Sequence, residues 1–270
     1  MAIKLVAMDL DDTLLRNDLT ISPRVAAAIR EAQRQGVRVT LATGRMPISA
    51  RPYAEQLGLD LPAITYHGAL IQQVLSGEVL FRRVLPKDLA ATMVEEFLTL
   101  GVHTQIYIKN RVFAQKRNPW SQQYSRLAAV AVEIKNLQEV LRTEPEGVDK
   151  ILLMGEEQDL DALAPHLREK FGGKVHITKS KPMFLEVTES SVNKGVALAA
   201  LAARFGITQA ETMAIGDSFN DLEMIEYAGL GVAMGNARPE VKAKADIVTG
   251  TNQEDGVAQA LERYVLEPKD

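Results

Sequence analysis

The sequence predicts an α/β protein with a doubly wound parallel-sheet core and an inserted α+β segment. Three observations support this class. Short apolar runs alternate with helical patterns near both ends of the 270-residue chain, a rhythm typical of parallel sheets with crossover helices. The middle of the chain is less regular and hairpin-like. Polar clusters follow predicted strands in both terminal regions, where open α/β sheets bind ligands.

The composition limits which binding partners and which cellular location we expect for the protein. Apolar residues make up 46% of the chain and charged residues 24%, which is ordinary for a globular protein with a sizeable core. The net charge is −4. The sequence contains neither a basic stripe that would bind nucleic acid nor a polybasic patch that would bind a membrane. The absence of cysteine excludes disulfides and thiolate chemistry. No signal peptide or transmembrane stretch is predicted, so we expect a soluble cytoplasmic protein.

The N-terminal region alternates predicted strands and helices. Residues 3–10 (IKLVAMDL) form an apolar run typical of a buried strand. Residues 22–36 predict a helix, with Ser22 as N-cap, Pro23 at the first helical position and Gly36 as the stop. The next predicted elements are a strand over 37–45, a helix over 48–58 and, within 61–71, a strand that ends at a glycine turn.

The C-terminal region repeats this alternation, and the middle does not. Helices are predicted over 194–206, 220–229, 239–245 and 256–266, and strands over 212–217, 230–236 and 246–249. Residues 105–116 (QIYIKNRVFAQK) instead predict an antiparallel hairpin with Lys-Asn at its turn. We therefore expect a core formed by 1–82 and 188–270, interrupted by an α+β insertion over 83–187.

Four polar clusters lie at the ends of predicted strands or at the start of a helix. They contain Asp9, Asp11, Asp12 and Thr13; Thr43, Gly44 and Arg45; Asn193, Lys194 and Gly195; and Asp217, Asn220 and Asp221. We expect them to meet in one crevice. Asp9, Asp11 and Asp217 would bring too much negative charge into a cleft without a cation. Mg²⁺ suits carboxylate and phosphate oxygens, whereas no Cys–His cluster indicates zinc.

These residue types suit phosphoryl transfer. An aspartate beside Mg²⁺ and Lys194 can attack phosphorus and form an aspartyl phosphate. Thr43 offers a hydroxyl group, and Gly44 lets the backbone approach a phosphate oxygen. Lys194 supplies a positive charge at a helix start, where it opposes the helix dipole. That unfavourable placement favours a phosphate partner over a purely structural role.

The same clusters resemble the four motifs of the haloacid dehalogenase superfamily. DLDDT resembles its first motif, ATGR its second, the lysine of VNKG its third and GDSFND its fourth. The long insertion after TYHGAL and the return at FLEVTESSVNKG resemble the Cof-type branch, a group of Mg²⁺-dependent phosphatases. This resemblance implies a Rossmann-like core and a mobile α+β cap that closes over the substrate and selects it.

The resemblance also implies roles for the matching positions. Asp9 would be the nucleophile, and Asp11 the general acid and base. The implied phosphate-binding residues are Thr43, Gly44, Lys194 and Asn220. The implied metal ligands are Asp9, Asp217 and the backbone carbonyl of Asp11; Asp221 would bind the metal through water or support the other ligands. Arg45 and His67 are candidate substrate contacts. Asp12 and His67 stand where this branch usually carries Gly and Asn.

The expected reaction is Mg²⁺-dependent hydrolysis of phosphate monoesters of small metabolites, through a phospho-aspartate at Asp9. Sugar phosphates and phosphorylated cofactors are the implied substrate class. Two alternatives are a phosphotransferase or mutase, which would not release free phosphate, and a non-catalytic phosphometabolite sensor. A sensor would use Lys194 and Thr43 but would not need both Asp9 and Asp11. The sequence carries no signal for the oligomeric state.

Overall fold

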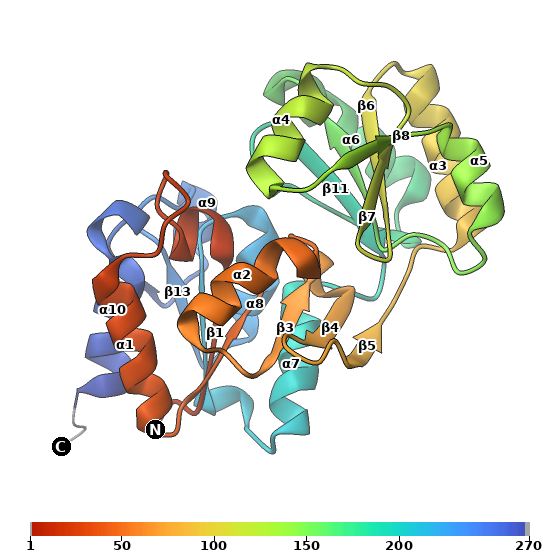
Figure 1. Ribbon diagram of the computed structural model, residues 1–270. Coiled ribbons are helices and arrows are strands. Elements are labelled where there is room, and N and C mark those ends of the chain that lie inside the picture. Colours follow the sequence, from red (N-terminus) through yellow and green to blue (C-terminus); the bar gives the residue numbers. More distant parts are fainter. Residues whose placement is uncertain (1, 268–270) are drawn as a thin grey trace. The chain divides into compact units, whose positions relative to one another are not determined.

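The computed structural model describes residues 2–267, which form two compact units (Figure 1). The first unit combines Met1–Leu80 with Asn193–Asp270, and the second is the continuous segment Phe81–Val192. The second unit is therefore inserted into the sequence of the first. Within residues 2–267, no helix has the length and apolar character needed to cross a membrane.

A five-stranded parallel sheet forms the centre of the first unit, in the order β14-β13-β12-β1-β2. Its strands are β1 (Leu5–Met8), β2 (Arg38–Leu41), β12 (Thr212–Gly216), β13 (Leu230–Ala233) and β14 (Ile247–Val248). All residues of β1 are buried, as in a strand that is covered on both faces. The strand order reverses at β1, and such a switch point is where doubly wound sheets bind ligands. The predicted fold class is confirmed.

Helices flank this sheet and contribute to its apolar core. They are α1 (Pro23–Arg34), α2 (Pro47–Leu57), α7 (Lys194–Arg204), α8 (Leu222–Tyr227), α9 (Pro239–Lys242) and α10 (Gly256–Leu261). The α1 helix begins where predicted, because Ser22 Oγ accepts the N–H of Val25 (3.1 Å) and Pro23 occupies the first helical position. The α1 helix packs with α10, and α7 packs with α8.

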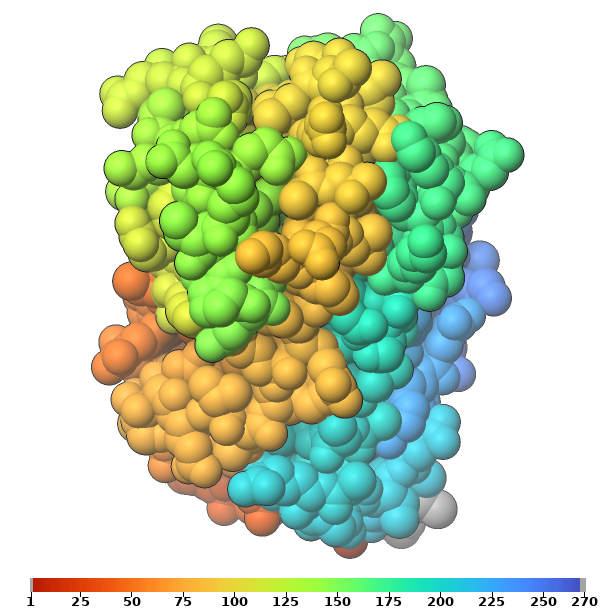
Figure 2. All heavy atoms as spheres, turned by 90° about the vertical axis from the view of Figure 1, so that its right-hand side faces the viewer, coloured from red at the N-terminus to blue at the C-terminus, as the bar shows by residue number. Residues whose placement is uncertain are grey.

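Residues 61–71, predicted as a strand that ends at a glycine turn, form most of a hairpin. The chain runs through β3 (Pro62–Thr65), turns at Tyr66–Gly68 and returns as the antiparallel β4 (Leu70–Gln73). All three turn residues have positive φ values, which reverse the chain inside an apolar run. The strand β5 (Val79–Arg82) completes a three-stranded sheet. The exposed turn before it belongs to the orange-gold surface in Figure 2.

The second unit has a six-stranded sheet in the order β10-β11-β9-β6-β7-β8, antiparallel except for the pair β7–β8. Its strands are β6 (His103–Ile108), β7 (Arg111–Ala114), β8 (Val132–Ile134), β9 (Lys150–Met154), β10 (Val175–Thr178) and β11 (Phe184–Glu189). The predicted β6–β7 hairpin is confirmed, with Lys109 and Asn110 at positive φ in its turn.

Four helices belong to this unit: α3 (Lys87–Thr99), α4 (Pro119–Ala128), α5 (Leu137–Thr143) and α6 (Glu157–Phe171). Side chains of α3, α5 and α6 share one apolar core with the sheet. The α4 helix is not among the predicted elements, because its sequence is short and polar. Its start carries a recognisable signal: Asn118 forms a capping box with Ser121, and Pro119 is the first helical residue.

Candidate active site

The carboxyl ends of β1, β2 and β12 lie next to one another in the first unit. Met8 pairs with Leu41 on one side and with Ile215 on the other. Asp9 follows β1 directly, and its backbone N–H donates to the carbonyl of Ile215 (2.9 Å). The central strand therefore delivers Asp9 to the edge where the polar segments after β2 and β12 begin.

Lys194, the first residue of α7, joins two of the predicted acids. Its Nζ donates to Asp9 Oδ1 (2.5 Å) and to Asp221 Oδ1 (2.6 Å), and its side chain is fully buried. Burial by itself would lower the pKa of Lys194. The charges of Asp221 and Asp9 outweigh this effect and raise the pKa well above its ordinary value. The lysine is therefore held as a cation beside Asp9.

Asp221 connects Lys194 to the loop after β12. While its Oδ1 accepts from Lys194, its Oδ2 accepts the backbone N–H groups of Asp217 and Ser218, both at 3.0 Å. Gly216 makes this arrangement possible, since a Cβ there would lie 2.5 Å from the Cβ of Asp221. Both oxygens of Asp221 are thus engaged by the chain itself. This arrangement suits a residue that fixes Lys194 and Asp217 in place.

Asp217 is held by Thr13, a member of the first polar cluster to which the sequence analysis assigns no role. Thr13 Oγ1 donates to Asp217 Oδ1 (2.7 Å), although the two residues are 204 positions apart. The only sequence signal for Thr13 is its place as the last residue of DLDDT. Burial, and then the charges of Asp221 and Asp9, raise the pKa of Asp217 well above its ordinary value.

The acids converge into a cluster that suits a hard cation. Asp9, Asp217 and Asp221 each offer one oxygen, and these oxygens all lie within 4.8 Å of one another. Burial raises the pKa of Asp9 to about 8; Lys194 acts in the opposite direction, and Asp221 and Asp11 add to the rise. Such excess negative charge is relieved by a divalent cation, and carboxylate oxygens are what Mg²⁺ prefers.

Asp11 lies at the margin of this cluster, paired with Arg45. Arg45 Nε donates to Asp11 Oδ2 and Nη2 donates to Oδ1, both at 2.8 Å. Asp12, next in the chain, has φ 61°, and its carbonyl accepts from the side-chain amide of Asn236 (2.7 Å). Glycine adopts this conformation freely, and aspartate is one of the few other residues that tolerate it.

The remaining predicted residues surround the segment after β2. Thr43 is buried, and its Oγ1 accepts the backbone N–H of Arg45 (3.1 Å). The imidazole of His67 lies beside Gly44, where an added Cβ would come within 2.2 Å of the ring. His67 is 1% exposed, and its Nδ1 lies 3.3 Å from the amide nitrogen of Asn220. His67 therefore contacts both Gly44 and Asn220, close to Thr43.

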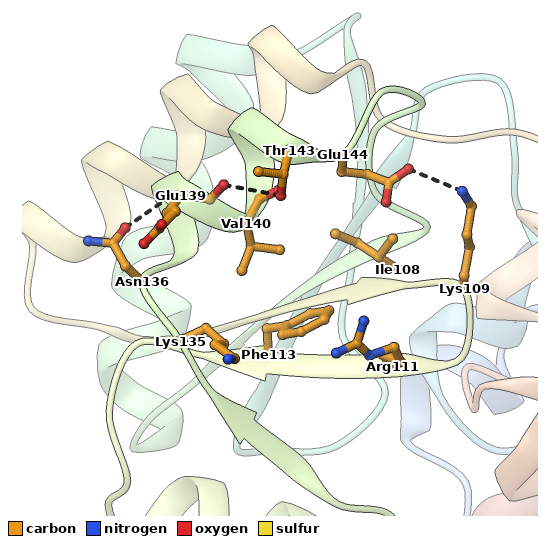
Figure 3. A pocket seen from close by; sticks show the side chains of 10 residues that line it. All are labelled: Ile108, Lys109, Arg111, Phe113, Lys135, Asn136, Glu139, Val140, Thr143 and Glu144. Atoms are coloured by element: carbon orange, nitrogen blue, oxygen red, sulfur yellow. Dashed lines mark hydrogen bonds and ion pairs between the residues drawn. The ribbon is translucent and has the colours of Figure 1, made fainter.

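A hollow in the second unit lacks an acidic cluster like the one at Asp9, within the described residues. It has a volume of about 400 Å³ and lies between α5 and the β6–β7 hairpin (Figure 3). Phe113 belongs to its apolar lining, and two of its charged residues, Lys109 and Arg111, pair with nearby glutamates. Lys109 Nζ lies 3.3 Å from Glu144, and Arg111 forms two hydrogen bonds with Glu133. The candidate active site is therefore the acidic cluster of the first unit.

Comparison with known proteins identifies the family. Residues 6–261 match the family model of haloacid dehalogenase-like hydrolases, and the chain belongs to this family. It is 35% identical to a 5-amino-6-(5-phospho-D-ribitylamino)uracil phosphatase of Bacillus subtilis over 98% of this chain and 96% of that protein. It is 31% identical to an HMP-PP phosphatase of Escherichia coli, over 89% and 87% of the two chains.

A solved structure with the same fold agrees with this assignment. The haloacid dehalogenase-like hydrolase from Bacteroides thetaiotaomicron aligns with a TM-score of 0.85 at 34% identity, covering 97% of this chain and 99% of that one. Family, relatives and fold together make the chain a phosphoric monoester hydrolase of the haloacid dehalogenase type.

Proposed function

We propose that this enzyme hydrolyses phosphate monoesters of small metabolites through a phospho-aspartate at Asp9, with Mg²⁺ as cofactor. The observation that carries the proposal is the fully buried Lys194, held between Asp9 and Asp221 with Asp217 within reach of both acids. Such an arrangement supports a nucleophile, a phosphate-binding cation and a metal-binding group that act together.

The acidic cluster fits the proposed Mg²⁺. Asp9 and Asp217 would bind the ion, with the backbone carbonyl of Asp11 as a further ligand, and Asp221 would support them through its contacts with Lys194 and the Asp217 loop. The raised pKa values of Asp9 and Asp217 mark a charge excess that a divalent cation would remove. When bound, Mg²⁺ would neutralise charge on the phosphoryl group and on the attacking carboxylate.

The reaction divides into two half-reactions. In the first, a carboxylate oxygen of Asp9 bonds to phosphorus while the bond from phosphorus to the leaving oxygen breaks. The electron pair stays on the leaving oxygen, which receives a proton from Asp11. In the second, Asp11 takes a proton from water, the water oxygen bonds to phosphorus, and Asp9 is released as a carboxylate together with inorganic phosphate.

Other residues of the site hold the phosphoryl group. Lys194 is a triple donor; two of its donors are engaged by Asp9 and Asp221, so the third can reach a phosphoryl oxygen. The Thr43 hydroxyl and the amide of Asn220 supply further donors. Gly44 has no side chain, and the imidazole of His67 occupies the space that a Cβ would fill there.

The substrate class follows from the relatives. The B. subtilis relative is named for a phosphate carried on a ribityl chain, and the E. coli relative is named for HMP-PP. We therefore favour small phosphorylated metabolites, including sugar phosphates and phosphorylated cofactors or their precursors. The inserted unit Phe81–Val192 is proposed to act as the cap that selects among them.

Phosphate release tests the proposal. The substrates are 4-nitrophenyl phosphate and a panel of sugar, polyol and cofactor phosphates, each assayed with Mg²⁺ and with a chelator. We expect hydrolysis that requires Mg²⁺, and we expect Asp9→Asn to lower kcat by about 10³-fold or more, because the nucleophile is lost.

Asp12→Asn is the matched control. It makes the same change of carboxylate to amide three residues away, at a position that has no proposed chemistry and a backbone conformation that Asn tolerates. We expect it to retain activity within about threefold. Activity that survives in Asp9→Asn, or that is indifferent to the chelator, would contradict the proposed mechanism.

A further inference from the structure

We infer that Arg45 is a positioning residue: its guanidinium holds the carboxyl group of Asp11 in place, so that this group can give a proton to the leaving oxygen, and Arg45 does not bind the phosphoryl group. This inference rests on the proposed phosphatase reaction. It assigns Arg45 a role other than the substrate contact for which the sequence makes it a candidate.

The contact between the two residues is a two-point pair. Arg45 Nε and Nη2 each donate to a different oxygen of Asp11, and both distances are 2.8 Å. A planar guanidinium that meets a carboxylate in this way fixes its distance and its orientation, which a lysine ammonium cannot do. Arg45 therefore determines where the Asp11 oxygens lie and in which plane.

Arg45 is itself fixed by the helix that follows it. Its third guanidinium nitrogen, Nη1, donates to Ser49 Oγ on α2 (3.2 Å), and its guanidinium carbon lies 5.3 Å from the centre of the Tyr53 ring. Its backbone N–H donates to Thr43 Oγ1 (3.1 Å), and its side chain is only 10% exposed. All three guanidinium nitrogens are thus engaged by the chain itself, so Asp11 and Ser49 fix the plane of the guanidinium.

Such a partner stabilises Asp11, because the charge of the nearby acids repels it. The acidic cluster holds Asp9, Asp217 and Asp221, and the carboxylate of Asp11 is not part of that group within the described residues. Its charge nevertheless acts on Asp9. The side chain of Asp11 is 26% exposed and could rotate into solvent. The two hydrogen bonds from Arg45 hold it in place.

This role predicts a dependence on the leaving group. An alkoxide leaving group needs a proton from Asp11 as its bond to phosphorus breaks, whereas 4-nitrophenolate departs without one. In a two-step reaction, kcat/KM covers events up to departure of the leaving group, so hydrolysis of the phospho-enzyme does not enter it. A misplaced Asp11 should therefore lower kcat/KM for alkyl phosphates much more than for the aryl phosphate.

The experiment compares kcat/KM for 4-nitrophenyl phosphate and for the best alkyl phosphate of the panel in the wild type, Arg45→Gln and Arg45→Lys. We expect Arg45→Gln to lower the alkyl-to-aryl ratio by about ten- to hundredfold, a part of the full general-acid contribution. Arg45→Lys should restore part of the ratio, because it keeps the charge but loses the fork. Arg51→Gln, an exposed arginine of α2 paired with Glu55, is the control and should leave the ratio unchanged.

The outcomes separate this inference from the proposed function. If Arg45→Gln lowers kcat/KM equally for both substrates, Arg45 acts on the phosphoryl group or on folding, and the inference is wrong. The inference also fails if neither value changes. In the Asp11→Asn background, Arg45→Gln should not change the ratio further, and a further tenfold loss would contradict the inference. A wild type that releases no phosphate from any compound would overturn the proposed function, and this inference with it.

Discussion

Backbone conformation at single residues shapes the loops around Asp9. Asp12 has φ 61° and His67 has φ 58°, and both values lie in the left-handed region that favours Gly, Asn, Asp and His. These are the two departures from the Cof-type pattern that the sequence analysis names. The departures therefore preserve the turn geometry, and Asn236 reinforces it at Asp12 by donating to the Asp12 carbonyl.

Repulsion among the acids gives a prediction for Asp217→Asn. Burial and neighbouring charges raise the folded-state pKa values of Asp9, to about 8, and of Asp217. Between the ordinary value of 3.8 and the raised value, the folded state binds more protons than the unfolded state, so metal-free stability falls as pH rises. In chelator at pH 8, Asp217→Asn should be more stable than the wild type by roughly 1–2 kcal/mol.

Thermal unfolding with and without Mg²⁺ measures this effect. The wild type should gain stability on addition of Mg²⁺, and Asp217→Asn should gain little, because a proposed ligand is missing. Asp12→Asn is again the control and should respond as the wild type does. An Asp217→Asn protein that is less stable than the wild type in chelator at pH 8, or is stabilised equally by Mg²⁺, would argue against a metal site at this cluster.

A buried histidine on the β6 strand makes the stability of the second unit depend on pH. Nε2 and Nδ1 of His103 lie 3.0 Å from the side-chain amide nitrogens of Gln105 and Asn118, respectively. Burial, with a smaller effect of Lys116, lowers the pKa of His103 to about 4. Between pH 6.5 and 4 the unfolded chain binds a proton that the folded chain does not, so this residue makes the fold lose stability as pH falls.

The prediction is that His103→Gln flattens the pH dependence of stability. The difference between wild type and variant in the free energy of urea unfolding should change by up to about 3 kcal/mol between pH 7 and 4. His166→Gln replaces a histidine of the same unit that is half exposed and pairs with Glu96, and it provides the control. Parallel pH profiles for wild type and His103→Gln would contradict the assignment.

At the scale of elements, the sequence predicts long, regular patterns better than short ones. The α1 helix and the β6–β7 hairpin were predictable because a cap, a proline or a turn signal accompanies the apolar pattern. In the β3–β4 hairpin, the first strand and the glycine turn were predicted, but the return strand was not, because Tyr66 continues the apolar run through the turn. In α4, polar residues hide the helical period, although Asn118 and Pro119 mark its start.

At the scale of the whole molecule, the central sheet joins segments that are far apart in the chain. Leu5 of β1 pairs with Thr212 of β12, across the entire inserted unit. The alternation of strands and helices at both ends predicted this sheet. Side-chain contacts such as Thr13 with Asp217, or Arg45 with Asp11, could not be predicted, because they depend on loop conformations that local patterns do not encode.

The inserted unit should fold on its own. It is one continuous segment, Phe81–Val192, with its own six-stranded sheet and its own apolar core, and segments of this size commonly form independent domains. Expressed alone, it should unfold in one cooperative thermal transition and give dispersed amide resonances. A broad, non-cooperative transition would indicate that its core depends on the remainder of the chain.

The central claim, a covalent phospho-aspartate at Asp9, is tested most directly by trapping it. In Asp11→Asn, 4-nitrophenyl phosphate should still phosphorylate Asp9, because nitrophenolate leaves without a proton, whereas hydrolysis of the phospho-enzyme should be slow. We predict a burst of one nitrophenolate per enzyme molecule. Borohydride reduction of the quenched protein should then yield homoserine at position 9, detected by peptide mass spectrometry. Continued turnover without a burst, and with Asp9 unmodified, would contradict the covalent mechanism.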